Sequence, residues 1–155
     1  MHAPLRSIPI DDYRSLLGKE LGVSPWREID QALINNFADL TDDHQFIHTS
    51  PDLALLTPFG ATIAHGFLVL SLLTAMSYQA VPAIAGTRMG VNYGFDRVRF
   101  IAPVREGRRV RARFVLSALE PLDGQRLRIT QNATVEIEGE RKPALIADWI
   151  SMVWI

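Results

Sequence analysis

The chain has 155 residues, of which 48% are apolar and 21% are charged, with a formal net charge of −1 and no cysteine. This length and composition predict one globular domain over residues 1–155, large enough to bury a core. The near-neutral charge argues against nucleic acid as a partner, because phosphate binding needs a surplus of lysine and arginine, and the lack of cysteine excludes disulfides and thiolate nucleophiles.

Short elements are expected in the N-terminal part of the chain. Residues 1–20 form a predicted N-terminal extension with a helix-like piece at residues 11–17, and a short strand is expected at residues 26–29. The extension mixes charges and prolines. Because it lacks the apolar core of a signal peptide, we expect a cytoplasmic protein.

Two helix starts follow, with a loop between them. Asp30 is a favourable N-cap for an amphipathic helix over residues 31–41. A loop is expected over residues 43–48. A second, shorter helix starts at Ser50-Pro51, where serine is a good cap and proline a good first helical residue, and it ends before Pro58.

Residues 63–84 are almost entirely apolar and approach the length of a membrane span. The segment also contains His65, Gly66, Tyr78 and Pro82, and no basic cluster flanks it. A helix that a sheet covers on most sides would have the same pattern. We therefore predict a buried central helix and no association with a membrane.

The C-terminal half changes to a strand-like period of two. Turn residues separate the candidate strands, so antiparallel pairing with one apolar face is expected. Helices followed by such strands predict the α+β class. The expected strands are residues 91–101, 109–119, 126–138 and 143–155.

Two short runs carry most of the chemistry, Thr41-Asp-Asp-His-Gln-Phe-Ile-His48 and Ile63-Ala-His-Gly66. Asp43 and His48 place a carboxylate and an imidazole five residues apart, and Gly66 opens the apolar helix, whose first turn has free N–H groups. Such a set can add or remove water beside a carbonyl. The alternatives are structural: Asp43 as a helix cap, His48 as a polar loop residue and Gly66 as a point of close helix packing.

These runs, with Pro58-Phe-Gly60 between them, resemble the hydratase motif of the MaoC-like dehydratases. They resemble more closely the nodulation-protein-N-like branch, which includes (R)-specific enoyl-CoA hydratases. The resemblance implies a hotdog fold, an antiparallel sheet wrapped around a long central helix. It also implies that Asp43 and His48 are the catalytic pair and that the backbone N–H of Gly66 is the oxyanion donor.

The implied reaction is the reversible syn addition of water to trans-2-enoyl-CoA, giving (3R)-3-hydroxyacyl-CoA. The acyl-CoA thioester is then the substrate, and no cofactor is expected because coenzyme A is part of that substrate. The histidines do not follow a zinc-ligand spacing, so we expect no metal. His65 is expected to be a structural residue, whereas His44 and Gln45 are possible neighbours of the site.

Two positions depart from the family motif. Asp42 stands where Thr-Gly-Asp has glycine, and aspartate tolerates a positive φ better than most residues. Asp42 places a second carboxylate beside Asp43. We therefore expect it to affect the rate and the substrate preference more than the fold. Ser50 stands where His-x-Asp-Pro has aspartate, and we expect it to cap the following helix as aspartate would.

A run of seven arginines lies on the first two long predicted strands and in the turn between them. Its alternation predicts a solvated face of the sheet; the alternative is that two or three of these arginines bind the phosphates of coenzyme A. The sequence does not say which. The arginines are residues 97, 99, 105, 108, 109, 111 and 113.

Two other functions fit the same fold. A hotdog thioesterase would release free thiol, and a non-catalytic acyl-CoA-binding protein would bind without turnover. A single sheet around one helix also leaves an edge strand and part of the helix uncovered. Pairing with a second copy would cover both, so we expect a homodimer.

Overall fold

The computed structural model describes residues 6–155; residues 1–5 of the predicted N-terminal extension lie outside this part. The elements in chain order are β1 Ser7–Ile8, α1 Ile10–Arg14, β2 Glu20–Val23, β3 Arg27–Ile29, α2 Gln31–Thr41, α3 Phe46–Thr49, α4 Pro51–Ala54, α5 Gly66–Ala80, β4 Ala83–Ile84, β5 Met89–Phe100, β6 Arg108–Asp123, β7 Arg126–Ile137 and β8 Leu145–Trp154.

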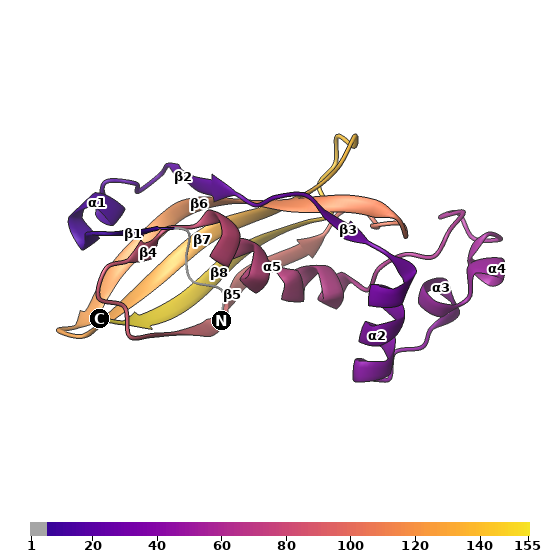
Figure 1. Ribbon diagram of the computed structural model, residues 1–155, viewed down its shortest axis with the longest axis horizontal. Coiled ribbons are helices and arrows are strands. Elements are labelled where there is room, and N and C mark those ends of the chain that lie inside the picture. The colour runs from indigo at the N-terminus through magenta and orange to yellow at the C-terminus, as the bar shows by residue number, and fades with distance from the viewer. Residues whose placement is uncertain (1–5) are drawn as a thin grey trace.

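The main sheet is antiparallel and has the strand order β2-β6-β7-β8-β5, with β3 paired to β6 next to β2. Figure 1 shows α5 lying along one face of this curved sheet, while α2, α3 and α4 gather beyond one of its ends. The α+β class and the arrangement of one long helix against an antiparallel sheet are therefore confirmed.

The core lies between α5 and the inner face of the sheet. Buried residues alternate along β7, as expected for a strand with one covered face. On the other side of this core, α5 buries Leu68, Val69, Leu72, Leu73 and Met76. Its opposite side carries the exposed residues Phe67 and Tyr78, so the sheet covers only part of the helix.

The segment over residues 63–84 is a helix only from Gly66 to Ala80. The helix begins later than predicted because Ile63 and Ala64 form hydrogen bonds to other segments. Ile63 N–H donates to the Ile47 carbonyl, and Ala64 N–H donates to the Val104 carbonyl. Within residues 6–155, no helix is both long enough and apolar enough to cross a membrane.

Local signals placed α2 correctly. The Asp30 side chain accepts a hydrogen bond from the Leu33 N–H at 2.8 Å, as its N-cap role predicts. At the other end, Asp42 has a left-handed conformation with φ 58°. This is the positive φ expected at the position that the motif fills with glycine.

Two details of the following segment differ from the prediction. Residues 43–48 are not all loop, because α3 starts at Phe46 and includes His48. The cap predicted at Ser50 is wrong: the residue stands at the start of α4, but its side chain makes no capping hydrogen bond. Its backbone instead joins two helical turns, donating to the Phe46 carbonyl and accepting from Ala54 N–H.

Strand β5 forms one edge of the sheet and is exposed along almost its whole length. Its exposed apolar residues are Met89, Val91, Tyr93, Phe95 and Phe100. A long, apolar and unpaired edge strand is uncommon on an isolated domain because it attracts other strands.

Candidate active site

His48 lies at the end of α3 with its imidazole buried, 7% exposed. Its Nδ1 lies 2.7 Å from the Ile63 carbonyl oxygen. A carbonyl can only accept, so Nδ1 carries the proton of this hydrogen bond. In the neutral ring, Nε2 is then the nitrogen with a free lone pair, which gives His48 the form of a base.

Asp43 follows the left-handed residue Asp42 at the end of α2. Its side chain is 54% exposed, and one carboxylate oxygen accepts a long hydrogen bond of 3.4 Å from the Gln45 N–H. Its backbone carbonyl accepts a hydrogen bond from His65 Nε2 at 2.9 Å. The sharp turn at Asp42 therefore directs Asp43 back toward the start of α5.

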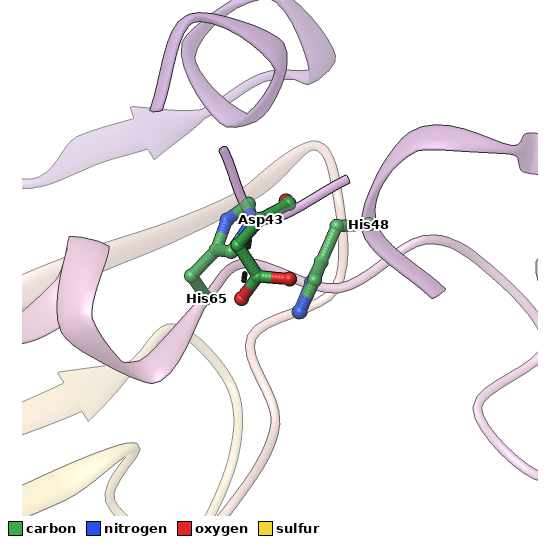
Figure 2. Close-up of side chains that lie close together, drawn as sticks. All are labelled: Asp43, His48 and His65. Atoms are coloured by element: carbon green, nitrogen blue, oxygen red, sulfur yellow. Dashed lines mark hydrogen bonds and ion pairs between the residues drawn. The ribbon is translucent and has the colours of Figure 1, made fainter. Parts of the chain in front are cut away.

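The structure brings Asp43, His48 and His65 into one cluster. A carboxylate oxygen and one ring nitrogen of each imidazole lie within 4.8 Å of one another, and Figure 2 shows the three side chains together. The rings of His48 and His65 stack, with centroids 3.8 Å apart and an interplanar angle of 23°. The sequence motifs predicted the first two members but not the contact with His65.

Three such groups at this separation raise the question of a metal ion. Imidazole binds a metal through a lone pair in the plane of its ring, at about 2.0–2.1 Å. The stacked rings direct their lone pairs along similar planes, so they do not converge on one ion between them. The stacked arrangement of the rings therefore does not favour a metal ion, and a metal-free site stays a prediction.

Burial sets the protonation of His48. Desolvation lowers the pKa of His48 below its ordinary value of 6.5, and the neighbouring His65 acts in the same direction. The hydrogen bond to Ile63 and the charge of Asp43 act the other way but are outweighed. His48 is therefore neutral at pH 7, with Nε2 available to accept a proton.

A mostly apolar cavity of about 290 Å³ opens beside His48, with Gly66 in its wall. Gly66 is the first residue of α5, so its N–H has no acceptor within the helix. A Cβ at Gly66 would lie 2.9 Å from the Phe100 ring of β5. The cavity is lined by His48, Phe59, Ile63, Ala64, Gly66, Val69, Phe100, Ile101, Ala102, Pro103, Val104 and Ala144.

Sequence reasoning missed Gln31, the first residue of α2. Its Nε2 donates to the His48 carbonyl oxygen at 2.7 Å, and its Oε1 accepts a hydrogen bond from the Thr62 hydroxyl. Gln31 thus ties α2, α3 and the segment before α5 together behind the imidazole. No local signal indicates this role, because a glutamine in the first turn of an exposed helix is ordinary.

Comparison with known proteins decides the family. A model described as the MaoC like domain matches residues 12–137. The chain belongs to the MaoC-like dehydratase family.

Nodulation protein N from Rhizobium meliloti (strain 1021) is 54% identical to this MaoC-like protein over 149 residues, 96% of this chain and 92% of the relative. The 3-hydroxyacyl-thioester dehydratase Z from Mycobacterium tuberculosis (strain CDC 1551 / Oshkosh) is 43% identical over 141 residues, 91% and 93% of the two chains. The solved (R)-hydratase from A. caviae involved in PHA biosynthesis is 23% identical with a TM-score of 0.72, covering 87% of this chain and 94% of that chain. The fold is the hotdog fold, as the sequence motifs implied.

The remaining predicted neighbours lie outside the cluster. His44 is exposed and faces Asp39, with its Nε2 3.7 Å from the carboxylate. Gln45 contacts Asp43 only through its backbone N–H.

The arginine run mostly forms ion pairs on the outer surface of this MaoC-like protein. Arg109, Arg111 and Arg113 pair with glutamates of β7, β2 and the turn after β7, as expected for a solvated sheet face. Arg97 lies 3.3 Å from the Asp148 carboxylate. Within residues 6–155, the members of the run that form no ion pair are Arg99, Arg105 and Arg108.

Proposed function

We propose that this protein is an (R)-specific enoyl-CoA hydratase/dehydratase that adds water reversibly to trans-2-enoyl-CoA and forms (3R)-3-hydroxyacyl-CoA. The single observation that carries the proposal is the clustering of the Asp43 carboxylate with His48, which together with Gly66 lines a mostly apolar cavity. The dehydratase named among its relatives supports the same reaction class.

In the proposed hydration, a water molecule lies between the Asp43 carboxylate and His48 Nε2. Nε2 takes one proton as the water oxygen bonds to C3 of the enoyl group, and the imidazolium then gives that proton to C2. Because both atoms come from the same water on the same face, the addition is syn. Asp43 orients the water and stabilises the transient positive charge on His48.

The thioester oxygen gains negative charge as C3 is attacked. We assign its stabilisation to the N–H of Gly66, which stands at the positive end of the α5 dipole and lines the cavity. The apolar remainder of the cavity suits an acyl chain. In this arrangement Asp43 and His48 act at the thioester end of the acyl chain, and the thioester carbonyl lies beside Gly66.

The decisive experiment follows the loss of enoyl absorbance of crotonyl-CoA, with a thiol-reactive dye in parallel samples. We expect hydration without thiol release and a chirally resolved (3R) product. Asp43→Asn and His48→Ala should each lower turnover by at least about 10²-fold, because the first removes the carboxylate that stabilises the transient imidazolium and the second removes the group that transfers the proton. Both should leave the thermal unfolding midpoint near that of the wild type.

The matched control is His44→Ala, which removes an exposed imidazole next to the cluster and should keep normal turnover. Release of thiol would replace the proposal with a thioesterase. Binding without turnover, on crotonyl-CoA and on longer enoyl-CoA substrates alike, would replace it with an acyl-CoA-binding protein. Near-normal turnover in either site variant would remove the residue assignment.

We also propose a homodimer. Strand β5 offers an apolar edge at one side of the sheet, and α5 has an exposed side with Phe67 and Tyr78. A second copy that paired along β5 would cover apolar surface that water otherwise contacts. The substrate class and the pairing are both proposals for this chain, and they are tested separately.

A further inference from the structure

His65 is buried at the start of α5 and contacts both members of the proposed catalytic pair. It is 3% exposed. Its ring stacks on His48 with centroids 3.8 Å apart, and its Nε2 lies 2.9 Å from the backbone carbonyl oxygen of Asp43. The ring of Phe37, from α2, packs on it with centroids 5.1 Å apart.

The hydrogen bonds determine which nitrogen of His65 carries a proton. Nε2 must donate, because its partner is the Asp43 carbonyl. Nδ1 is buried and has no hydrogen-bond partner within residues 6–155. The ring is therefore held in the tautomer that donates through Nε2.

Each of the two contacts controls a different group. The stack covers one face of His48 and keeps water from it, which helps to hold that ring neutral. The hydrogen bond holds the backbone of Asp43, whose own carboxylate is half exposed and has only the long contact to Gln45. Ala64 and Gly66, on either side of His65, are among the residues that line the cavity.

We propose that His65 is a positioning residue that holds Asp43 and His48 in one fixed arrangement, through a hydrogen bond to the Asp43 backbone carbonyl and a ring stack on the His48 imidazole. The inference rests on the proposed hydratase function, because the pair is catalytic only under that function. It revises the expectation from the sequence that His65 is a structural histidine.

Two substitutions separate the contacts. His65→Phe keeps a flat ring against His48 but removes the donor to Asp43. His65→Gln keeps an N–H near the position of Nε2 but removes the ring. Both should lower kcat, by about 10²-fold for a shift of about 1 Å in a reacting group. Both should leave KM nearly unchanged, because the residues that line the cavity include the neighbours of His65 but not His65 itself.

The pH dependence distinguishes positioning from simple packing. His48, Asp43 and His65 are the titratable groups that act on one another at this site. In His65→Gln, water reaches the uncovered face of His48, so its pKa rises toward 6.5 and the acid limb of kcat/KM moves to higher pH. In His65→Phe, the face stays covered and only the electrostatic effect of His65 is lost, so the limb moves less than in His65→Gln.

The experiment measures the pKa of His48 by NMR titration of labelled imidazole in the wild type and both variants, together with kcat, KM and the thermal midpoint. The NMR arm needs no turnover, so it tests the inference even if the hydratase proposal fails. An unchanged His48 pKa in His65→Gln, or an unchanged kcat in His65→Phe from an active wild type, would overturn it. A loss confined to the thermal midpoint would also overturn it, since packing alone explains that result. His44→Gln, an exposed histidine outside the cluster, is the matched control.

Discussion

At the scale of single residues, hydrogen bonds to backbone carbonyls determine the chemical state of the site. His48 donates through Nδ1 to Ile63 and His65 donates through Nε2 to Asp43. Each bond selects one tautomer and leaves the other nitrogen without a proton. Burial then lowers the pKa of His48, so protonation that would block a base occurs only below its ordinary value of 6.5.

Asp42 allows a test of the turn that places Asp43. Its φ of 58° lies in the left-handed region, which glycine adopts without cost and alanine adopts at about 1–2 kcal/mol. We predict that Asp42→Gly is more stable than Asp42→Ala by about 1 kcal/mol, measured by urea unfolding.

Asp42→Asn is the companion variant, because asparagine also tolerates this conformation but has no charge. Comparing the turnover of Asp42→Asn with that of the wild type measures the effect of the Asp42 carboxylate on catalysis by Asp43. An alanine variant as stable as the glycine variant would show that the turn is not under conformational strain.

At the scale of elements, contacts between segments moved the boundaries that local patterns predicted. Helix α5 starts at Gly66 because Ile63 and Ala64 are held in extended pairing. Strand β6 runs to Asp123, beyond the predicted end at residue 119, because β7 pairs with it almost to the turn. The alternation of buried residues in β7 was predictable, since one sheet face contacts α5.

Gly66 brings α5 close to β5. A Cβ there would lie 2.9 Å from the Phe100 ring, so a larger residue would force that ring to shift. We predict that Gly66→Ala lowers both stability and turnover, the latter by about 10²-fold. Adding Phe100→Leu should restore the thermal midpoint but not turnover, because the new methyl group still occupies the place where the thioester approaches.

Thermal unfolding and steady-state kinetics of the single and double variants decide between these roles. Full recovery of turnover in the double variant would mean that Gly66 serves packing only. The single variant Phe100→Leu shows how much of any change comes from the ring itself.

At the scale of the whole molecule, the two edges of the sheet differ. The short strands β2 and β3 pair with β6 at one edge, whereas the long strand β5 at the other edge carries exposed apolar side chains. Water contacts these side chains in the isolated chain, so burying them in an interface is favourable by about 25 cal/mol for each Å² of apolar surface.

We predict that the protein elutes and sediments at twice the chain mass of 17.4 kDa. Val91→Lys together with Tyr93→Lys should convert it to a monomer, because two charges would then lie in the interface. Leu122→Lys, which changes another exposed apolar residue on β6, is the control and should leave the mass unchanged. A wild-type protein that sediments as a monomer at micromolar concentration would contradict the proposed pairing.

Local patterning was enough to predict the class, the helices α2 and α5 and the four long strands, but it missed the short strands β1, β2 and β4 and the short helix α3. Apolar periodicity reports which face of an element is buried, and caps such as Asp30 act within one turn of the chain. Motif spacing predicted Asp43, His48 and Gly66 as site residues; the structure brings Asp43 and His48 together and places His48 and Gly66 in the cavity wall, and their roles stay predictions. The cap expected at Ser50 failed because α3 and α4 are joined there, which a local signal does not register.

Packing between distant segments decided the rest. Gln31 reaches His48 across 17 residues, His65 reaches Asp43 across 22, and Phe100 meets Gly66 from another element. These contacts depend on how α2, α3, α5 and β5 are arranged in space, which local periodicity does not specify. The tautomers, the burial of His48 and the cavity beside it are therefore properties of the tertiary structure.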